Sequence, residues 1–196
     1  MRFGVPADHI HIINFGIDAE YFSPRSPNPS IRAANKLGSA PAVISLRNFE
    51  PVYAIPTLLK AVPKVLEQHP NTRFMLVGHG SLEAELKALA SQLGIDHAVR
   101  FVGFLPNDQL PDILCSLDAY VSTSLSDAGL AASTSEAMAC GLPVVITDSG
   151  ENALWISDGE NGYLVPVSQP DALADRLNRL LGDAELRRRF GQAGRA

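Results

Sequence analysis

Short runs of mostly apolar residues alternate along this chain with segments in which apolar residues recur every three or four positions. The short runs predict buried β-strands, because they leave no polar face for solvent. The predicted strands cover residues 10–13, 42–46, 73–77, 99–101, 119–122, 144–146 and 163–165.

The periodic segments between these runs predict amphipathic helices. The predicted helices cover residues 56–67, 82–93, 109–116, 131–139, 172–181 and 184–191. Gly94 is expected to end one of them, and residues 22–35, rich in proline and asparagine, are expected to be irregular. Strand and helix in regular alternation predict an α/β fold: a Rossmann-like parallel sheet with helices on both faces, in a single domain of residues 1–196.

Composition narrows the classes of function. The net charge of −5 includes no basic stripe, so no nucleic-acid partner is expected. No run approaches the roughly 20 apolar residues of a membrane span, and no signal peptide opens the chain, so a cytoplasmic protein is expected. The five histidines lack metal-ligand spacing, so neither a metal site nor a cofactor is predicted. Cys115 and Cys140 lie in apolar helical patterns and are expected to be buried thiols.

Ligands of open α/β sheets bind beyond the carboxyl ends of the strands. Arg47 follows a predicted strand directly, and a guanidinium there can hold a phosphate; a surface pair with Glu50 is the alternative. Gly78-His79-Gly80-Ser81 ends the next strand. Its glycines allow close approach of a nucleotide, and Gly80 or Ser81 can cap the following helix, although a plain tight turn also explains them.

The stretch from Ser126 to Thr147 leads from a polar loop through a small-residue helix into a buried strand. The helix N-terminus offers free N–H groups to a phosphate. Glu136 lies about one and a half turns into this helix, roughly 6–8 Å along its axis, where the ribose of a bound diphosphate would lie. The alternative is that the helix is simply packed and Glu136 satisfies a nearby backbone donor.

The run EAMACGLPVVIT, preceded by SLSDAG and followed by DGENGYLVP, resembles the nucleotide-sugar-binding, C-terminal half of retaining glycosyltransferases with the GT-B fold, the glycosyl transferases group 1 family. Other segments resemble the family in the same order, from about Ile10 to Phe190. They are IINFGIDAEYFSP, AVISLRNFE, RFMLVGHGSLEAELKALASQLGI and VRFVGFLPNDQLPDILCSLDAYVSTS.

The resemblance implies roles for individual residues. Glu136 would contact the ribose, and Arg47 the diphosphate. Gly78 and Gly80 would contact the nucleotide, and Phe104 and Leu105 the base. The backbone at Gly129 and Leu130 would contact the phosphates or the sugar, and Gly16 would lie at the junction of two domains.

Three departures from the family pattern bear on the chemistry. The family has a first glutamate eight residues before the second, where this chain has Ala128; the adjacent Asp127 is the candidate substitute and counts with Arg47 and Glu136 as a candidate catalytic residue. Val52 and Tyr53 occupy the region of the family's phosphate lysine. The chain is expected to lack the family's N-terminal, acceptor-binding domain.

The expected function is therefore that of the donor-binding domain of a glycosyltransferase. It would transfer a hexose from a UDP- or GDP-sugar to an acceptor with retention of anomeric configuration, together with the missing acceptor domain or a partner chain. The nucleotide sugar is then a substrate and not a cofactor. A non-catalytic nucleotide-binding module and half of a sugar-nucleotide epimerase are the alternatives.

Overall fold

The structure of the protein is a computed structural model that describes residue 4 and residues 6–11, 16–127 and 129–196. Its centre is a six-stranded parallel sheet in the order β3-β2-β1-β4-β5-β6. The strands are β1 (Ala42–Leu46), β2 (Arg73–Val77), β3 (Val99–Gly103), β4 (Ala119–Ser122), β5 (Val144–Thr147) and β6 (Tyr163–Val165). The predicted strand at residues 10–13 is not part of the sheet: residues 10 and 11 are not in a strand, and residues 12 and 13 lie outside the described part.

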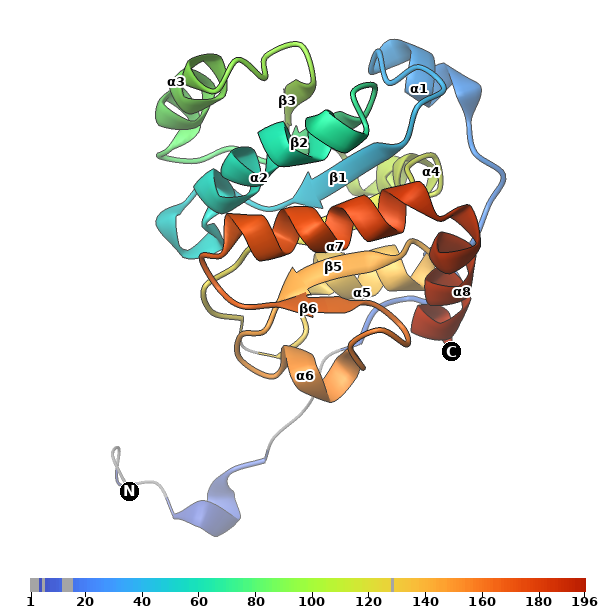
Figure 1. Ribbon diagram of the computed structural model, residues 1–196. Coiled ribbons are helices and arrows are strands. Elements are labelled where there is room, and N and C mark those ends of the chain that lie inside the picture. The colour runs from blue at the N-terminus through green and yellow to red at the C-terminus, as the bar shows by residue number, and fades with distance from the viewer. Residues whose placement is uncertain (1–3, 5, 12–15, 128) are drawn as a thin grey trace.

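Helices cover both faces of this sheet (Figure 1). They are α1 (Pro29–Ala34), α2 (Ile55–Gln68), α3 (Glu83–Gln92), α4 (Leu110–Leu114), α5 (Ala132–Ala139), α6 (Asn152–Trp155), α7 (Pro170–Gly182) and α8 (Ala184–Arg195). Single 3-10 turns occur at η1 (Ala7–His9), η2 (Pro51–Tyr53) and η3 (Asn107–Gln109). The predicted α/β fold with a helix-covered parallel sheet is confirmed.

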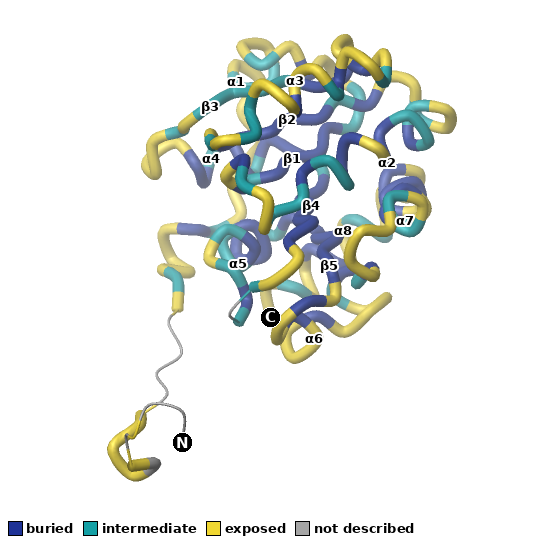
Figure 2. Tube along the Cα trace, turned by 90° about the vertical axis from the view of Figure 1, so that its left-hand side faces the viewer, coloured by how far each residue is buried: buried dark blue, intermediate teal, exposed yellow. Residues whose placement is uncertain are grey.

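The apolar side chains divide between two cores because neighbouring residues of a strand point to opposite faces. Val43 of β1 packs with α2, α3 and α7, whereas Ile44 packs with α4 and α5. Figure 2 shows the strands buried at the centre and the outer sides of the helices exposed. Neither face of the sheet is left to solvent, which agrees with the continuous apolar runs of the sequence.

Several local predictions were wrong. Residues 22–35 are not wholly irregular, since Asn28 accepts from the Ser30 N–H and Pro29 occupies the first turn of α1. Helix α3 has no side-chain cap, because the Ser81 hydroxyl and N–H both donate to Glu50 instead. Both thiols are free, but Cys115 is only half-buried.

The predicted end of α3 is confirmed, whereas one short helix was not predicted. Gly94 has φ +69° and follows Leu93, the C-cap residue of α3, as expected of a glycine that ends a helix. The short helix α6 was not predicted, because four residues are too few to show a helical period. In the described ranges no helix has the length and hydrophobicity needed to cross a membrane.

Candidate functional site

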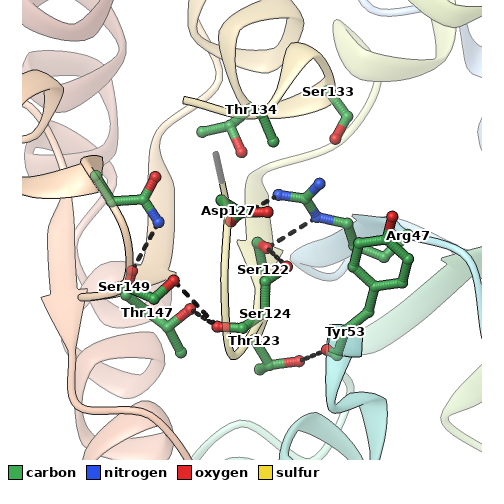
Figure 3. Close-up of polar contacts among 12 residues, drawn as sticks. Arg47, Tyr53, Ser122, Thr123, Ser124, Asp127, Ser133, Thr134, Thr147 and Ser149 are labelled. Atoms are coloured by element: carbon green, nitrogen blue, oxygen red, sulfur yellow. Dashed lines mark hydrogen bonds and ion pairs between the residues drawn. The ribbon is translucent and has the colours of Figure 1, made fainter. Parts of the chain in front are cut away.

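Arg47 lies at the carboxyl end of β1, where its N–H continues the ladder by donating to the Val77 carbonyl (3.1 Å). Its Nε donates to the Ser122 hydroxyl at the end of β4 (2.9 Å), and its Nη2 lies 3.3 Å from Oδ2 of Asp127. The two charged side chains are 8% and 7% exposed. The alternative pair between Arg47 and Glu50 is not formed, since Glu50 binds Ser81. The structure thus joins two of the three candidate catalytic residues in a buried ion pair (Figure 3).

An aromatic ring borders this pair where the family has a lysine. The Tyr53 ring centre lies 5.5 Å from Cζ of Arg47, within the range of a cation–π contact. Thr123 fixes the segment by donating to the carbonyls of Tyr53 (2.9 Å) and Ala54 (3.1 Å). Tyr53 therefore shields one side of the guanidinium without adding a second positive charge.

Hydroxyl groups tie the neighbouring loops together. The carbonyl of Ser124 accepts from Thr147 (2.6 Å) and Ser149 (3.2 Å), both at the end of β5, and the Ser124 hydroxyl lies 3.2 Å from that of Ser122. All these groups are buried. The loops after β4 and β5 are thus held in one polar network beside Arg47, as Figure 3 shows.

Helix α5 begins at Ala132 next to this network. Its N-cap residue, Ala131, provides no side-chain cap, so no side chain competes for the first N–H groups of the helix. The Ser133 and Thr134 hydroxyls lie 2.9 Å and 3.3 Å from the phenol oxygen of the buried Tyr120. In Figure 3, Ser133 and Thr134 lie on the side of α5 that faces the Arg47–Asp127 pair. An uncapped helix N-terminus beside an arginine is suited to an anion.

Glu136 lies in the second turn of α5 and is half-buried. Burial raises the pKa of its carboxyl above the usual value. Among the described residues it makes no hydrogen bond or ion pair, and its oxygens are not among the fully buried atoms that lack a partner. The carboxylate therefore remains open to an outside donor, and the alternative role of satisfying a nearby backbone N–H is not observed in this part of the chain.

The glycines of the Gly78-His79-Gly80 segment are required by packing. A Cβ on Gly78 would lie 2.2 Å from the Arg47 carbonyl oxygen, and one on Gly80 would lie 2.5 Å from that of Phe49. These two glycines let the chain beyond β2 run against the chain beyond β1, which positions Arg47. Their predicted contact with a nucleotide is an additional role that stays a prediction.

The other candidate residues have diverse environments. Phe104 is 72% exposed after β3, Leu105 packs partly against the core, and Leu130 is buried. Gly129 has φ +88°, a conformation that favours glycine. Gly16 is exposed, and a Cβ there would have no atom within 4 Å. Ala128 lies outside the described residues.

The sequence assigned no role in the site to Tyr53 or to the hydroxyl groups of Thr147 and Ser149, although the last two follow a predicted strand. Their position after strands was a usable signal, but their partners are distant in sequence. No cluster of three or more metal-binding side chains occurs within residues 16–127 and 129–196. A pocket of about 550 Å³ lies at the amino ends of β1 and β2. It is lined by residues 36–41 and 68–73 and is separate from this site.

The geometry can be compared with known proteins. The family model of glycosyl transferases group 1 matches residues 28–196. The chain belongs to this family. It is 30% identical over 190 residues to a GDP-mannose-dependent alpha-(1-6)-phosphatidylinositol monomannoside mannosyltransferase of Mycolicibacterium smegmatis, covering 92% of this chain and 49% of that protein. A D-inositol 3-phosphate glycosyltransferase of Kribbella flavida is 31% identical, covering 97% and 47%. The chain thus spans about half the length of these curated relatives.

Solved structures agree with the fold. The C-terminal domain of a glycosyl transferase group 1 family protein from Francisella tularensis has a TM-score of 0.83 at 25% identity, covering 92% of this chain and 95% of that one. An Anabaena protein, Alr3699/HepE, in complex with UDP and glucose has a TM-score of 0.85 at 23% identity, covering 98% and 52%. The fold is therefore that of one half of a GT-B glycosyltransferase, as predicted.

Proposed function

We propose that this chain is the donor-binding half of a glycosyltransferase that moves a hexose from a UDP- or GDP-sugar to an acceptor with retention of anomeric configuration. An N-terminal acceptor domain or a partner chain completes the active site in this proposal. The lengths of the two curated relatives support it, since each is about twice as long as the chain. The mannosyltransferase of Mycolicibacterium smegmatis is named as GDP-mannose-dependent. The Anabaena protein Alr3699/HepE has also been solved in complex with UDP-glucose.

The observation that carries the proposal is the arrangement of charge at the carboxyl edge of β1 and β4. A buried guanidinium, an uncapped helix N-terminus and a half-buried carboxylate without a hydrogen-bond partner in the described residues lie on neighbouring elements. The first two attract a diphosphate, and the carboxylate of Glu136 accepts hydrogen bonds from the two ribose hydroxyls.

The same groups contribute to the transfer step. As the bond between the sugar and the diphosphate breaks, negative charge grows on the departing diphosphate. Arg47 and the N-terminus of α5 stabilise that charge more strongly than they stabilise the intact donor, which lowers the barrier. Phe104 and Leu105 contact the base in this proposal, and the backbone at Gly129 contacts the phosphates or the sugar.

Calorimetry of the purified chain with UDP, GDP and ADP tests donor binding. UDP or GDP is expected to bind, and Glu136→Ala is expected to weaken that binding about tenfold, the effect of losing one or two hydrogen bonds to a charged group. Glu85→Ala, which removes an exposed carboxylate from helix α3, is the matched control and should change nothing. No binding of any nucleotide at millimolar concentration would refute the proposal.

The transfer step needs a separate test. Protein that also carries the acceptor-binding half is incubated with the nucleotide sugar that binds, and the anomeric configuration of the product is read by NMR. Retention is expected. A longer protein that binds the donor and transfers nothing would favour the non-catalytic module, a reading to which Tyr53 in place of the family's lysine lends support.

A further inference from the structure

Arg47 already holds an anion in this structure. The Asp127 carboxylate lies 3.3 Å from Nη2, and both side chains are less than a tenth exposed. Of the four other arginine–aspartate or arginine–glutamate pairs in the described residues, none is so deeply buried. One terminal nitrogen of the Arg47 guanidinium is therefore paired with a carboxylate of the protein.

The pairing leaves part of the guanidinium unused. Nε is occupied by Ser122 and Nη2 by Asp127, but Nη1 makes no hydrogen bond within the described ranges. Nη1 is also not among the fully buried atoms that lack a partner, which are Ser45 Oγ, Thr72 Oγ1, Asn152 Oδ1 and Asn178 Oδ1. Within the described ranges, Nη1 is therefore the donor of Arg47 that is left for an incoming phosphate.

The backbone of Asp127 lies against the loop after β5. Gly150 in that loop approaches so closely that a Cβ there would lie 1.9 Å from the Asp127 carbonyl oxygen. Rotation about the side-chain bonds would release the carboxylate from Arg47 without moving this packed backbone. Rotation of a side chain is fast compared with rearrangement of a packed loop.

A diphosphate and the Asp127 carboxylate cannot both lie against Arg47 without strong repulsion, because like charges a few ångströms apart in a partly buried site interact unfavourably. We propose that Asp127 is a built-in counter-ion of Arg47 that the donor's diphosphate displaces, so that donor binding exchanges one anion for another. Asp127 is then a positioning residue that sets the affinity for the diphosphate, whatever contact it later makes with the sugar. This inference rests on the proposed function.

The exchange predicts a gain of affinity on removing the carboxylate. Binding of UDP, uridine, GDP and guanosine to the wild-type chain and to Asp127→Asn is measured by calorimetry. The dissociation constant of the diphosphate is expected to fall about tenfold in the variant, because repulsion is removed, while that of the nucleoside is unchanged. Asp148→Asn is the matched control: it makes the same change of net charge at an exposed position at the end of β5, and should leave both constants unaltered.

Diphosphate affinity that is unchanged or weaker in Asp127→Asn would overturn the inference, as would an equal change for diphosphate and nucleoside. Thermal unfolding verifies that the variant is folded, and Asp127→Ser repeats the test with a smaller side chain if it is not. The two proposals fail differently. If the wild-type chain binds no nucleotide, the proposed function fails; if it binds a nucleoside diphosphate and removal of the carboxylate brings no gain, only the exchange fails.

Discussion

Two arginine–aspartate pairs lie at opposite ends of the same two strands, β1 and β4. At the amino end, Arg32 pairs with Asp118 (3.2 Å), and Asp118 accepts from the N–H of Ala42, the first residue of β1 (2.8 Å). At the carboxyl end, Arg47 pairs with Asp127 at almost the same distance, 3.3 Å. The pairs share their chemistry, and their surroundings differ.

All three nitrogens of the Arg32 guanidinium donate to the protein. Besides Asp118, its nitrogens donate to the carbonyls of Gly38 (2.9 Å), Ser116 (2.9 Å) and Ala40. Arg47 donates to one hydroxyl and one carboxylate, and its Nη1 has no partner within the described chain. The comparison indicates that a guanidinium with all three nitrogens engaged fixes the structure, whereas one with a nitrogen left over is available to a ligand.

The largest expected effect tests the structural pair. Arg32→Ala removes several charge-assisted hydrogen bonds, and is expected to lower the free energy of unfolding by about 2–4 kcal/mol. Urea unfolding measures this loss. Arg25→Ala, which breaks a pair whose side chains are 37% and 48% exposed, is the control and should cost less than about 1 kcal/mol. Equal losses in the two variants would contradict the structural role assigned to Arg32.

The second prediction concerns the ligand-binding pair. Arg47→Gln is expected to weaken binding of UDP or GDP about 10- to 100-fold, the effect of losing one charge-assisted contact of about 1.5–3 kcal/mol. Binding of the nucleoside should not change. Calorimetry measures both, with Arg179→Gln on the exposed side of α7 as the control. Because the substitution leaves the Asp127 carboxylate unpaired, the double variant Arg47→Gln/Asp127→Asn separates the loss of a phosphate contact from a loss of stability.

Gly150→Ala sharpens the comparison further, because Gly150 lies against the backbone of Asp127. Gly150 has φ +58°, and a Cβ would lie 1.9 Å from the Asp127 carbonyl oxygen, so a loss of about 1–3 kcal/mol in unfolding free energy is expected. Gly159→Ala provides the matched control, since Gly159 has φ +84° with no atom within 4 Å of a Cβ. Its cost is that of the left-handed conformation alone, about 1 kcal/mol. If both variants lose the same stability, the close contact with Asp127 contributes nothing.

The smallest effect depends on pH. Because burial raises the pKa of Glu136 above 4.5, the folded chain binds this proton more tightly than the unfolded chain, and the ionised carboxylate destabilises the fold. Glu136→Gln is therefore expected to unfold at slightly higher urea concentration than the wild type at pH 7. The difference should fade as the pH is lowered through the ordinary pKa of a glutamate, because the carboxyl then becomes protonated in both states. Glu85→Gln on α3 should show no such dependence, and a destabilised Glu136→Gln at pH 7 would show that the fold uses this carboxylate.

Much of the fold could be predicted from the sequence because the relevant interactions are local. The apolar runs at 42–46, 73–77 and 119–122 have the same bounds as β1, β2 and β4. Helix α6 and the capped turn of α1 were missed, since Asn28 and Pro29 act through a single helix end and not through a repeated pattern.

In the candidate site, too, some features follow from local sequence and others from the tertiary structure. The sequence by itself determined that Arg47, Asp127 and Glu136 lie beyond strand ends or in the following helix, because strand and helix periods are written in neighbouring residues. Only the tertiary structure decided that Arg47 pairs with Asp127, 80 positions away, and not with Glu50, three positions away. The reason is that charge attraction depends on distance in space, and β1 and β4 are adjacent in the sheet although β2 and β3 separate them in the chain.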